Sequence, residues 1–159
     1  MAADIFAKIG DIKGESLDAK HKDEVEVLSW SWGASRAAGA TAGSGAAAGK
    51  ASFNDFVITH RIDKASPLLF KACATGEHIK EATITVRKPG SKAQQEYLIV
   101  RMSDVVVDNV DQSGSDAGSA ETVSLVFAKV EYEYKPQKAD GSLDAGVFFK
   151  FDVKNSRVG

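Results

Sequence analysis

The chain has 159 residues, of which 43% are hydrophobic and 26% are charged, and its formal net charge is −2. This composition is typical of a globular protein with a single domain, residues 1–159, and differs from that of a disordered chain. The negative net charge argues against a nucleic-acid-binding protein, and the single cysteine, Cys73, excludes an internal disulfide.

The N-terminal residues predict neither a secretory signal nor a membrane anchor. Residues 1–10 lack a basic stretch followed by an apolar run, and no apolar run in the chain approaches the roughly 20 residues that span a bilayer. We therefore expect a protein that is made in the cytoplasm, contacts no membrane, and leaves the cell only by a route that accepts folded protein.

Alternation of apolar and polar residues predicts strands along most of the chain. In residues 25–32, Leu28, Trp30 and Trp32 are expected on one buried face, and Ser29 and Ser31 on the other. Such a small polar face can line a water-filled channel, or it can face solvent as many strands do. The predicted strands cover residues 5–9, 25–32, 53–60, 82–87, 96–102, 105–110, 121–135 and 147–153.

Two of these strands have clear faces. In residues 53–60, Phe56, Ile58 and His60 share one face. In residues 121–135 one face is expected to contain Val126, Ala128, Val130, Tyr132 and Tyr134. The other face begins with Val123, Leu125 and Phe127. Turns are predicted at residues 88–91 and 140–141.

One segment, residues 63–76, predicts a helix instead. Ser66 suits the N-cap, Pro67 the first helical position and Gly76 the C-terminal stop. An apolar stripe at helical spacing follows: Leu69, Phe70 and Cys73. The sequence therefore predicts a mainly β fold, a barrel or sandwich of two sheets with one short α-helix.

Residues 33–52 form a long loop in this prediction, with nine alanines and five glycines. Loops longer than about 12–15 residues are usually functional or disordered. The alanine methyl groups can pack against a partner, so a loop that couples to another subunit and a loop that is disordered in isolation both remain open.

The end of this loop, Gly49-Lys50, invites comparison with a Walker A motif. That motif needs a glycine where Ser44 stands and a hydroxyl residue where Ala51 stands, and a helix should follow it. A strand is predicted there instead, so we do not expect a nucleotide site.

Other residues do not predict a metal site or a catalytic centre. Cys73 lies on the apolar stripe of the helix, where a thiol is usually inert, and no serine occupies a G-x-S-x-G turn. We expect no cofactor and no enzymatic activity. The residues whose spacing fits no metal motif are His21, His60, His78, Asp104, Asp108, Asp111 and Asp116.

Five stretches resemble the haemolysin-coregulated protein family, which forms the inner tube of bacterial type VI secretion systems. They occur in the family's order between residues 6 and 152: FAKIGDIKGES, HKDEVEVLSWSWG, DKASPLLFKACATGEHI, VRKPG followed by EYLIV, and YKPQKADGS. The resemblance implies a β-barrel of two sheets, a homohexameric ring, and rings that stack into a hollow tube without enzymatic activity. The partners that it implies are a contractile sheath, a trimeric spike and small effector proteins in the lumen.

The resemblance also implies roles for particular residues. Ser29 and Ser31 lie on the strand that lines the lumen in the family. The loop that follows reaches the neighbouring ring, which gives a stacking role to Arg36, Thr41, Gly43, Ser44, Gly45, Gly49 and Lys50. We expect assembly in the bacterial cytoplasm and then secretion. The alternatives are a phage-type tail tube protein and a small β-sandwich that binds a ligand.

Overall fold

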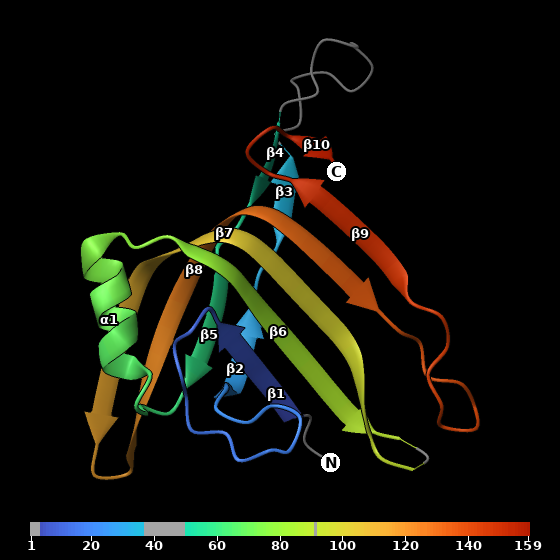
Figure 1. The fold of residues 1–159 in the computed structure, drawn as a ribbon, viewed down its shortest axis with the longest axis horizontal. Coiled ribbons are helices and arrows are strands. Elements are labelled where there is room, and N and C mark those ends of the chain that lie inside the picture. The colour runs from blue at the N-terminus through green and yellow to red at the C-terminus, as the bar shows by residue number, and fades with distance from the viewer. Residues whose placement is uncertain (1–3, 37–49, 91) are drawn as a thin grey trace.

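Antiparallel β-strands make up most of the structure (Figure 1). The computed structural model describes residues 4–36, 50–90 and 92–159. In chain order the elements are β1 (Asp4–Ile9), β2 (Val25–Ser31), β3 (Ala34–Arg36), β4 (Ala51–Phe53), β5 (Phe56–His60), α1 (Ser66–Thr75), β6 (Ile79–Pro89), β7 (Gln94–Ser115), β8 (Gly118–Tyr134), β9 (Val147–Asp152) and β10 (Arg157–Val158).

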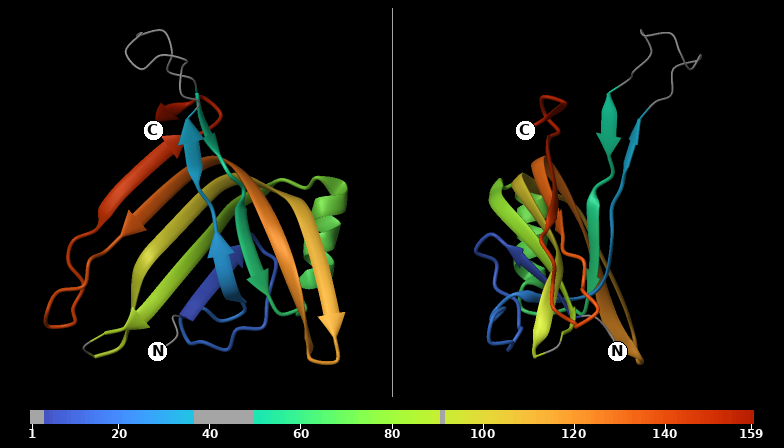
Figure 2. Two further views of the ribbon diagram at one scale, coloured as in Figure 1. Left: turned by 180° about the vertical axis from the view of Figure 1, so that it is seen from behind. Right: turned by 90° about the vertical axis from the view of Figure 1, so that its right-hand side faces the viewer.

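Six of the strands form a closed barrel. Their order is β8-β5-β2-β1-β6-β7, and a second pairing of β7 with β8 closes the ring of strands. All of these pairs are antiparallel. Beyond β8 the sheet continues into β9 and β10, which form a wing on one side of the barrel (Figures 1 and 2). The predicted mainly β barrel with one short helix is therefore confirmed.

The barrel core follows the predicted alternation in β5. Phe56, Ile58 and His60 are all fully buried, and Val57 and Thr59 point the other way. The partners of Phe56 and Ile58 on β8, Leu125 and Val123, are also fully buried. Burial of such side chains contributes about 1.5–3 kcal/mol each, so this strand pair is a main source of stability.

The long strands β7 and β8 bend together, which the sequence pattern did not predict. Two strands were expected at residues 96–102 and 105–110, but β7 is continuous. It bends at Asp104, whose φ is +53°, and the buried positions change parity between Met102 and Val105. The expected apolar face of β8 was accordingly wrong at Val126, which is 41% exposed.

The N-cap of the helix lies one residue earlier than predicted, and the helix therefore begins at Ser66 instead of Pro67. Ala65 is the N-cap, and Ser66 lies inside the helix, where its hydroxyl oxygen accepts a hydrogen bond from the Asp63 backbone N–H (3.1 Å). Gly76 ends the helix with φ of +67°, as predicted. In the predicted stripe Leu69 is buried but Phe70 is 44% exposed. Within the described residues, no helix has the length and hydrophobicity needed to cross a membrane.

The ends of the predicted 33–52 loop form a two-stranded ribbon, β3 and β4, rather than irregular loop. The strand predicted at 53–60 is interrupted after Phe53, where the Asn54 N–H donates to the Gly33 carbonyl oxygen (2.8 Å). The ribbon rises from the barrel at the end opposite the β7–β8 turn (Figure 2). Residues 34–36 and 51–53 are therefore strands rather than loop, and residues 37–49 lie outside the described residues.

Candidate functional site

A β-bulge in β2 determines which side chains face outward from the barrel. The pairing of β2 with β5 shifts by one residue between Val27 and Ser29, so Leu28 is the extra residue. Leu28 is 49% exposed, which corrects the expectation that it shares a buried face with the tryptophans. Beyond the bulge Trp30 packs on the core and Ser29 is exposed, so the predicted separation of tryptophan and serine holds there.

Two rows of side chains cross four strands of the barrel on its outer surface. The register of β2, β5, β8 and β7 places small or polar residues side by side in each row. We call these rows the small polar face. The first row is Ser29, Thr59, Thr122 and Asp111, and the second is Ser31, Val57, Ser124 and Asn109.

Hydrogen bonds confirm that these side chains share one surface. The hydroxyl oxygens of Thr59 and Thr122 lie 3.3 Å apart, and the Asn109 amide nitrogen donates to an Asp111 carboxylate oxygen at 3.0 Å. The stretches of β2, β5, β7 and β8 that carry the face, residues 25–31, 56–60, 105–115 and 118–127, contain no lysine or arginine. The face therefore carries short side chains and no cation.

An acidic group lies beside this face, at a bulge between β7 and β8. The pairing of β7 with β8 shifts between Val107 and Asn109, which makes Asp108 the extra residue. Loss of hydration, together with the neighbouring Asp55 carboxyl group, raises the pKa of Asp108 to about 6. Asp108 is consequently protonated as the pH falls through about 6, and the negative charge beside the small polar face decreases.

Aromatic side chains support the small polar face from inside. Trp30 stacks on Phe56 with ring centroids 5.9 Å apart, and Trp32 lies 5.6 Å from Phe56 and 6.2 Å from Phe127. Trp32 also stacks on Phe53 at the base of the ribbon, at 6.4 Å. Aromatic pairs at these separations stabilise beyond their buried area, so the cluster holds β2, the ribbon and β8 in a fixed arrangement.

A buried polar network lies behind the same strands. His60 and Glu121 are fully buried, and His60 Nε2 is 2.8 Å from Glu121 Oε1. The Gln112 amide donates to the other oxygen of Glu121 at 2.7 Å. This cluster joins β5, β8 and β7, so His60 contributes to the packing of the barrel.

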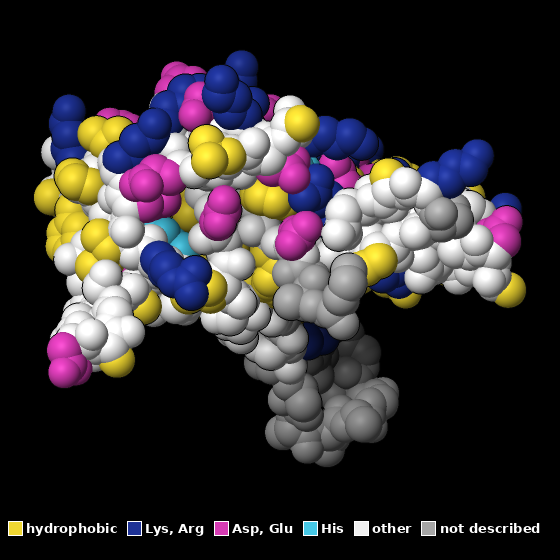
Figure 3. Space-filling model, turned by 90° about the horizontal axis from the view of Figure 1, so that it is seen from below, with side chains coloured by type: hydrophobic (Ala, Val, Ile, Leu, Met, Phe, Trp, Pro, Cys, Tyr) yellow, Lys and Arg dark blue, Asp and Glu magenta, His cyan; other side chains and the backbone are white. Residues whose placement is uncertain are grey.

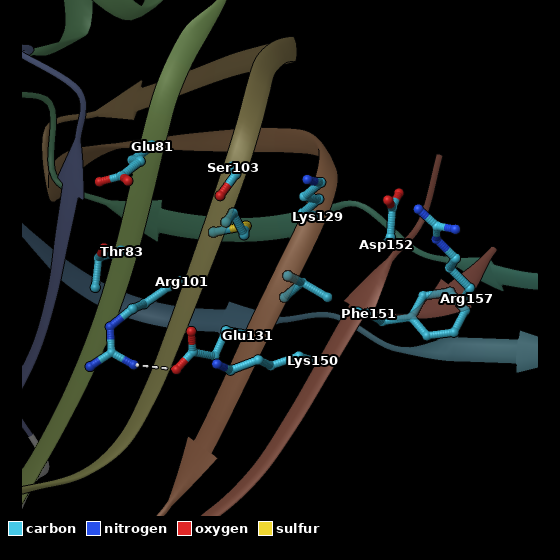
Figure 4. A pocket seen from close by; sticks show the side chains of 13 residues that line it. Glu81, Thr83, Arg101, Ser103, Lys129, Glu131, Lys150, Phe151, Asp152 and Arg157 are labelled. Carbon is cyan, nitrogen blue, oxygen red and sulfur yellow. Dashed lines mark hydrogen bonds and ion pairs between the residues drawn. The ribbon is translucent and has the colours of Figure 1, made fainter. Parts of the chain in front are cut away.

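The sheet of β6, β7, β8 and β9 has a very different outer surface, which is densely charged. Figure 3 shows lysine, arginine, aspartate and glutamate side chains gathered along one side of the molecule. A shallow groove of about 390 Å³ lies there (Figure 4). Arg101 forms an ion pair with Glu131 in it, at 3.2 Å. Other charged side chains that line the groove are Glu81, Lys129, Lys150, Asp152 and Arg157.

The structure describes only part of the predicted stacking loop. Arg36 and Lys50 are exposed, and Arg36 pairs with Ala51 at the end of the ribbon. The positions that lie outside the described residues are Thr41, Gly43, Ser44, Gly45 and Gly49.

Sequence reasoning found two members of the small polar face, Ser29 and Ser31, which are both exposed. It missed the other six: Val57, Thr59, Thr122, Ser124, Asn109 and Asp111. The alternation within residues 56–60 and 121–125 contained the signal for four of them, but only strand pairing shows that they lie beside the serines. Among residues 4–36, 50–90 and 92–159, no three His, Cys, Asp or Glu side chains gather in a way that could hold a metal ion.

Comparison with known proteins identifies the family. The family model described as "Type VI secretion system effector, Hcp" matches residues 6–134. Protein hcp1 of Pseudomonas aeruginosa is 46% identical over 148 residues, which cover 92% of this chain and 91% of that protein. The chain therefore belongs to the Hcp family of type VI secretion systems.

Solved structures agree with this assignment. Hcp1 of Salmonella typhimurium is 41% identical, with a TM-score of 0.82 and 99% of both chains covered. A type VI secretion system effector of Yersinia pestis is 36% identical, with a TM-score of 0.77, over 94% of this chain and all of that one. The family consists of secreted structural tube proteins, so this chain is a structural protein and not an enzyme.

Proposed function

We propose that the chain is the subunit of a homohexameric ring, and that such rings stack into the hollow inner tube of a type VI secretion system. Its membership of the Hcp family supports this assignment. The observation that carries the proposal is the small polar face, an outward surface of short, uncharged or acidic side chains held rigid by aromatic packing.

In this proposal the small polar face lines the channel, with Ser29 and Ser31 in contact with cargo. Short side chains without lysine or arginine leave the channel wide, and they offer few long charged groups that could hold a passing protein. The cargo is small effector proteins, which travel within the ring.

The ribbon of β3 and β4 carries the stacking function. Its exposed end brings Arg36 and Lys50 to the segment that contacts the next ring. Contacts between rings need to be weaker than contacts within a ring, because tubes should form only where the secretion system assembles. A segment rich in glycine and alanine provides this weakness, since it loses conformational entropy when it is ordered on contact.

The remaining partners follow from the same role. A contractile sheath encloses the tube, and a trimeric spike caps it. The protein assembles in the bacterial cytoplasm and is then secreted, without binding nucleic acid or membrane.

The ring is tested by light scattering after size-exclusion chromatography, combined with negative-stain imaging. We expect a species of six times the 16.9 kDa of the chain, with a central hole. A monomer at all accessible concentrations would contradict the hexamer and would favour the alternative of a β-sandwich that binds a ligand.

A further inference from the structure

The ribbon of β3 and β4 has few side chains that can fix its direction. Its strands form a two-stranded sheet that is separate from the eight-stranded sheet. All three residues of β3 are exposed, and in β4 Ser52 is exposed while Ala51 and Phe53 are half-buried. Phe53 is the one large apolar side chain of the two strands, so the direction of the ribbon depends on where that ring is held.

The ring of Phe53 is held by two parts of the molecule, the barrel and the β9 wing. From the barrel side, Trp32 and Phe127 have ring centroids 6.4 and 6.1 Å from that of Phe53. From β9, the rings of Phe149 and Phe151 lie 6.4 and 5.3 Å away, and they stack on each other at 5.9 Å. The wing therefore contributes as many aromatic partners to Phe53 as the barrel does.

Only one face of β9 takes part in these contacts. Phe149 pairs with Tyr132 of β8, whose ring lies 5.8 Å from that of Trp32, so this face of the two strands meets the aromatic cluster. Successive side chains of a strand point to opposite faces, and Phe148 accordingly points away from Phe53 and is 54% exposed. Two neighbouring phenylalanines of one strand thus differ in whether they contact the ribbon.

The wing is firmly attached to the barrel, which makes it a suitable support. Six residue pairs join β9 to β8, from Lys129 with Asp152 to Tyr134 with Val147. The backbone N–H of Val153 adds a hydrogen bond to the Ala128 carbonyl oxygen at 2.8 Å. The ribbon, in contrast, is joined to the barrel through the chain at its base and through the ring of Phe53.

We propose that Phe149 and Phe151 are positioning residues that fix the ribbon through the ring of Phe53. The β9 wing then sets the direction in which the ribbon presents Arg36 and Lys50 to the next ring. This inference rests on the proposed stacking function, and it adds to that function a strand that lies outside both the barrel and the ribbon. A segment that is already held in its bound direction loses less conformational entropy on contact, so the support of β9 strengthens stacking.

The test compares the same substitution at two adjacent positions of β9. Phe149→Ala removes a ring that contacts Phe53, and Phe148→Ala is the matched control, because it removes a ring from the opposite face of the strand. Phe149→Tyr is the conservative variant, since it keeps the aromatic contact. Circular dichroism first establishes that each variant is folded.

The motion of the ribbon is measured directly, by time-resolved fluorescence anisotropy of a dye on the exposed β3 residue Ser35. The dye is attached through Ser35→Cys in a chain that also carries Cys73→Ser, because Cys73 is the only other thiol. Ring mass and tube length are then measured on the same β9 variants without the dye, by light scattering and negative-stain imaging.

We expect the dye to move through a wider angle on the nanosecond scale in Phe149→Ala, and Phe148→Ala and Phe149→Tyr to match the parent chain. Phe149→Ala should also form rings of unchanged mass but shorter tubes. Phe151→Ala removes the other ring of β9 that contacts Phe53, and it replaces Phe149→Ala in the tube comparison should that variant form no rings.

Equal dye motion in Phe149→Ala and Phe148→Ala would overturn the positioning role, and so would wider motion that leaves tube length unchanged. A parent chain that forms neither rings nor tubes would instead overturn the proposed function. The comparison of dye motion would then still decide whether β9 holds the ribbon, because it does not depend on assembly.

Discussion

At the scale of single residues, Glu121 is the charged residue whose substitution we expect to destabilise the fold most. Its carboxylate is fully buried, and it accepts hydrogen bonds from Gln112 and lies against His60. Glu131 on the same strand pairs instead with Arg101, which is 44% exposed in its side chain. Substituting each of the two glutamates by alanine therefore compares the effect of a buried and of an exposed glutamate on stability.

We predict that Glu121→Ala lowers the free energy of unfolding by about 3–5 kcal/mol, because it leaves the fully buried His60 without its polar partner. Glu131→Ala should cost less than about 1 kcal/mol, since its ion pair is exposed to solvent. Urea unfolding at one fixed protein concentration compares the two variants. Equal midpoints would show that the buried network contributes no more than a surface pair.

Ser31 provides the residue-scale test of the channel. We predict that Ser31→Gln leaves folding and ring formation unchanged but lowers the amount of effector that co-elutes with the rings. The reason is that a longer side chain would project from a face whose other members are short. Ser103→Gln is the control, because Ser103 lies on the charged groove of the other sheet. Loss of folding in Ser31→Gln would show that the face points inward.

At the scale of elements, the β3–β4 ribbon is separable from the barrel. Its base is held by Trp32 and Phe53, whose rings stack at 6.4 Å, and its strands pair with each other rather than with the large sheet. Shortening the segment beyond the ribbon should therefore leave the barrel intact.

We predict that deletion of residues 38–48 leaves single rings intact and abolishes their stacking. The deletion leaves Ala37, Gly49 and Lys50 between the paired residues Arg36 and Ala51, and three residues with a glycine suit a hairpin. Tube length in negative-stain images is the measurement. Tubes of normal length from this variant would remove the stacking role from the segment.

At the scale of the whole molecule, most strands and the helix could be predicted from the sequence because they depend on local patterns. Those patterns left a barrel and a sandwich open, and only the family resemblance implied the barrel. The alternation of Phe56, Ile58 and His60 was sufficient to predict their burial, and Gly76 was sufficient to end the helix. Only two of the eight residues of the small polar face, Ser29 and Ser31, were predicted, because its rows join strands that are distant in the chain.

Most of the remaining differences share a physical cause. A bulge adds one residue to a strand, and either a bulge or a bend changes which of the later residues face the core. Alternation alone does not reveal where this change occurs. It occurs here at Leu28, Tyr97, Asp104 and Asp108. The prediction that Ser66 is the N-cap was wrong for a different reason. Its hydroxyl oxygen accepts a hydrogen bond from the backbone N–H of Asp63, which precedes the helix, and Ala65 is the N-cap.

The bulge at Leu28 has a consequence for how this protein can change over evolutionary time. If the same residues were paired without the bulge, the alternation of Val25 and Val27 would continue inward through Ser29 and Ser31. The two tryptophans would then face the space that the serines now border. Loss of the Leu28 codon would remove the bulge and keep the tryptophans inward. Gain of one codon elsewhere in β2 would instead exchange the two surfaces of the strand beyond the insertion, unless a further bulge absorbed it.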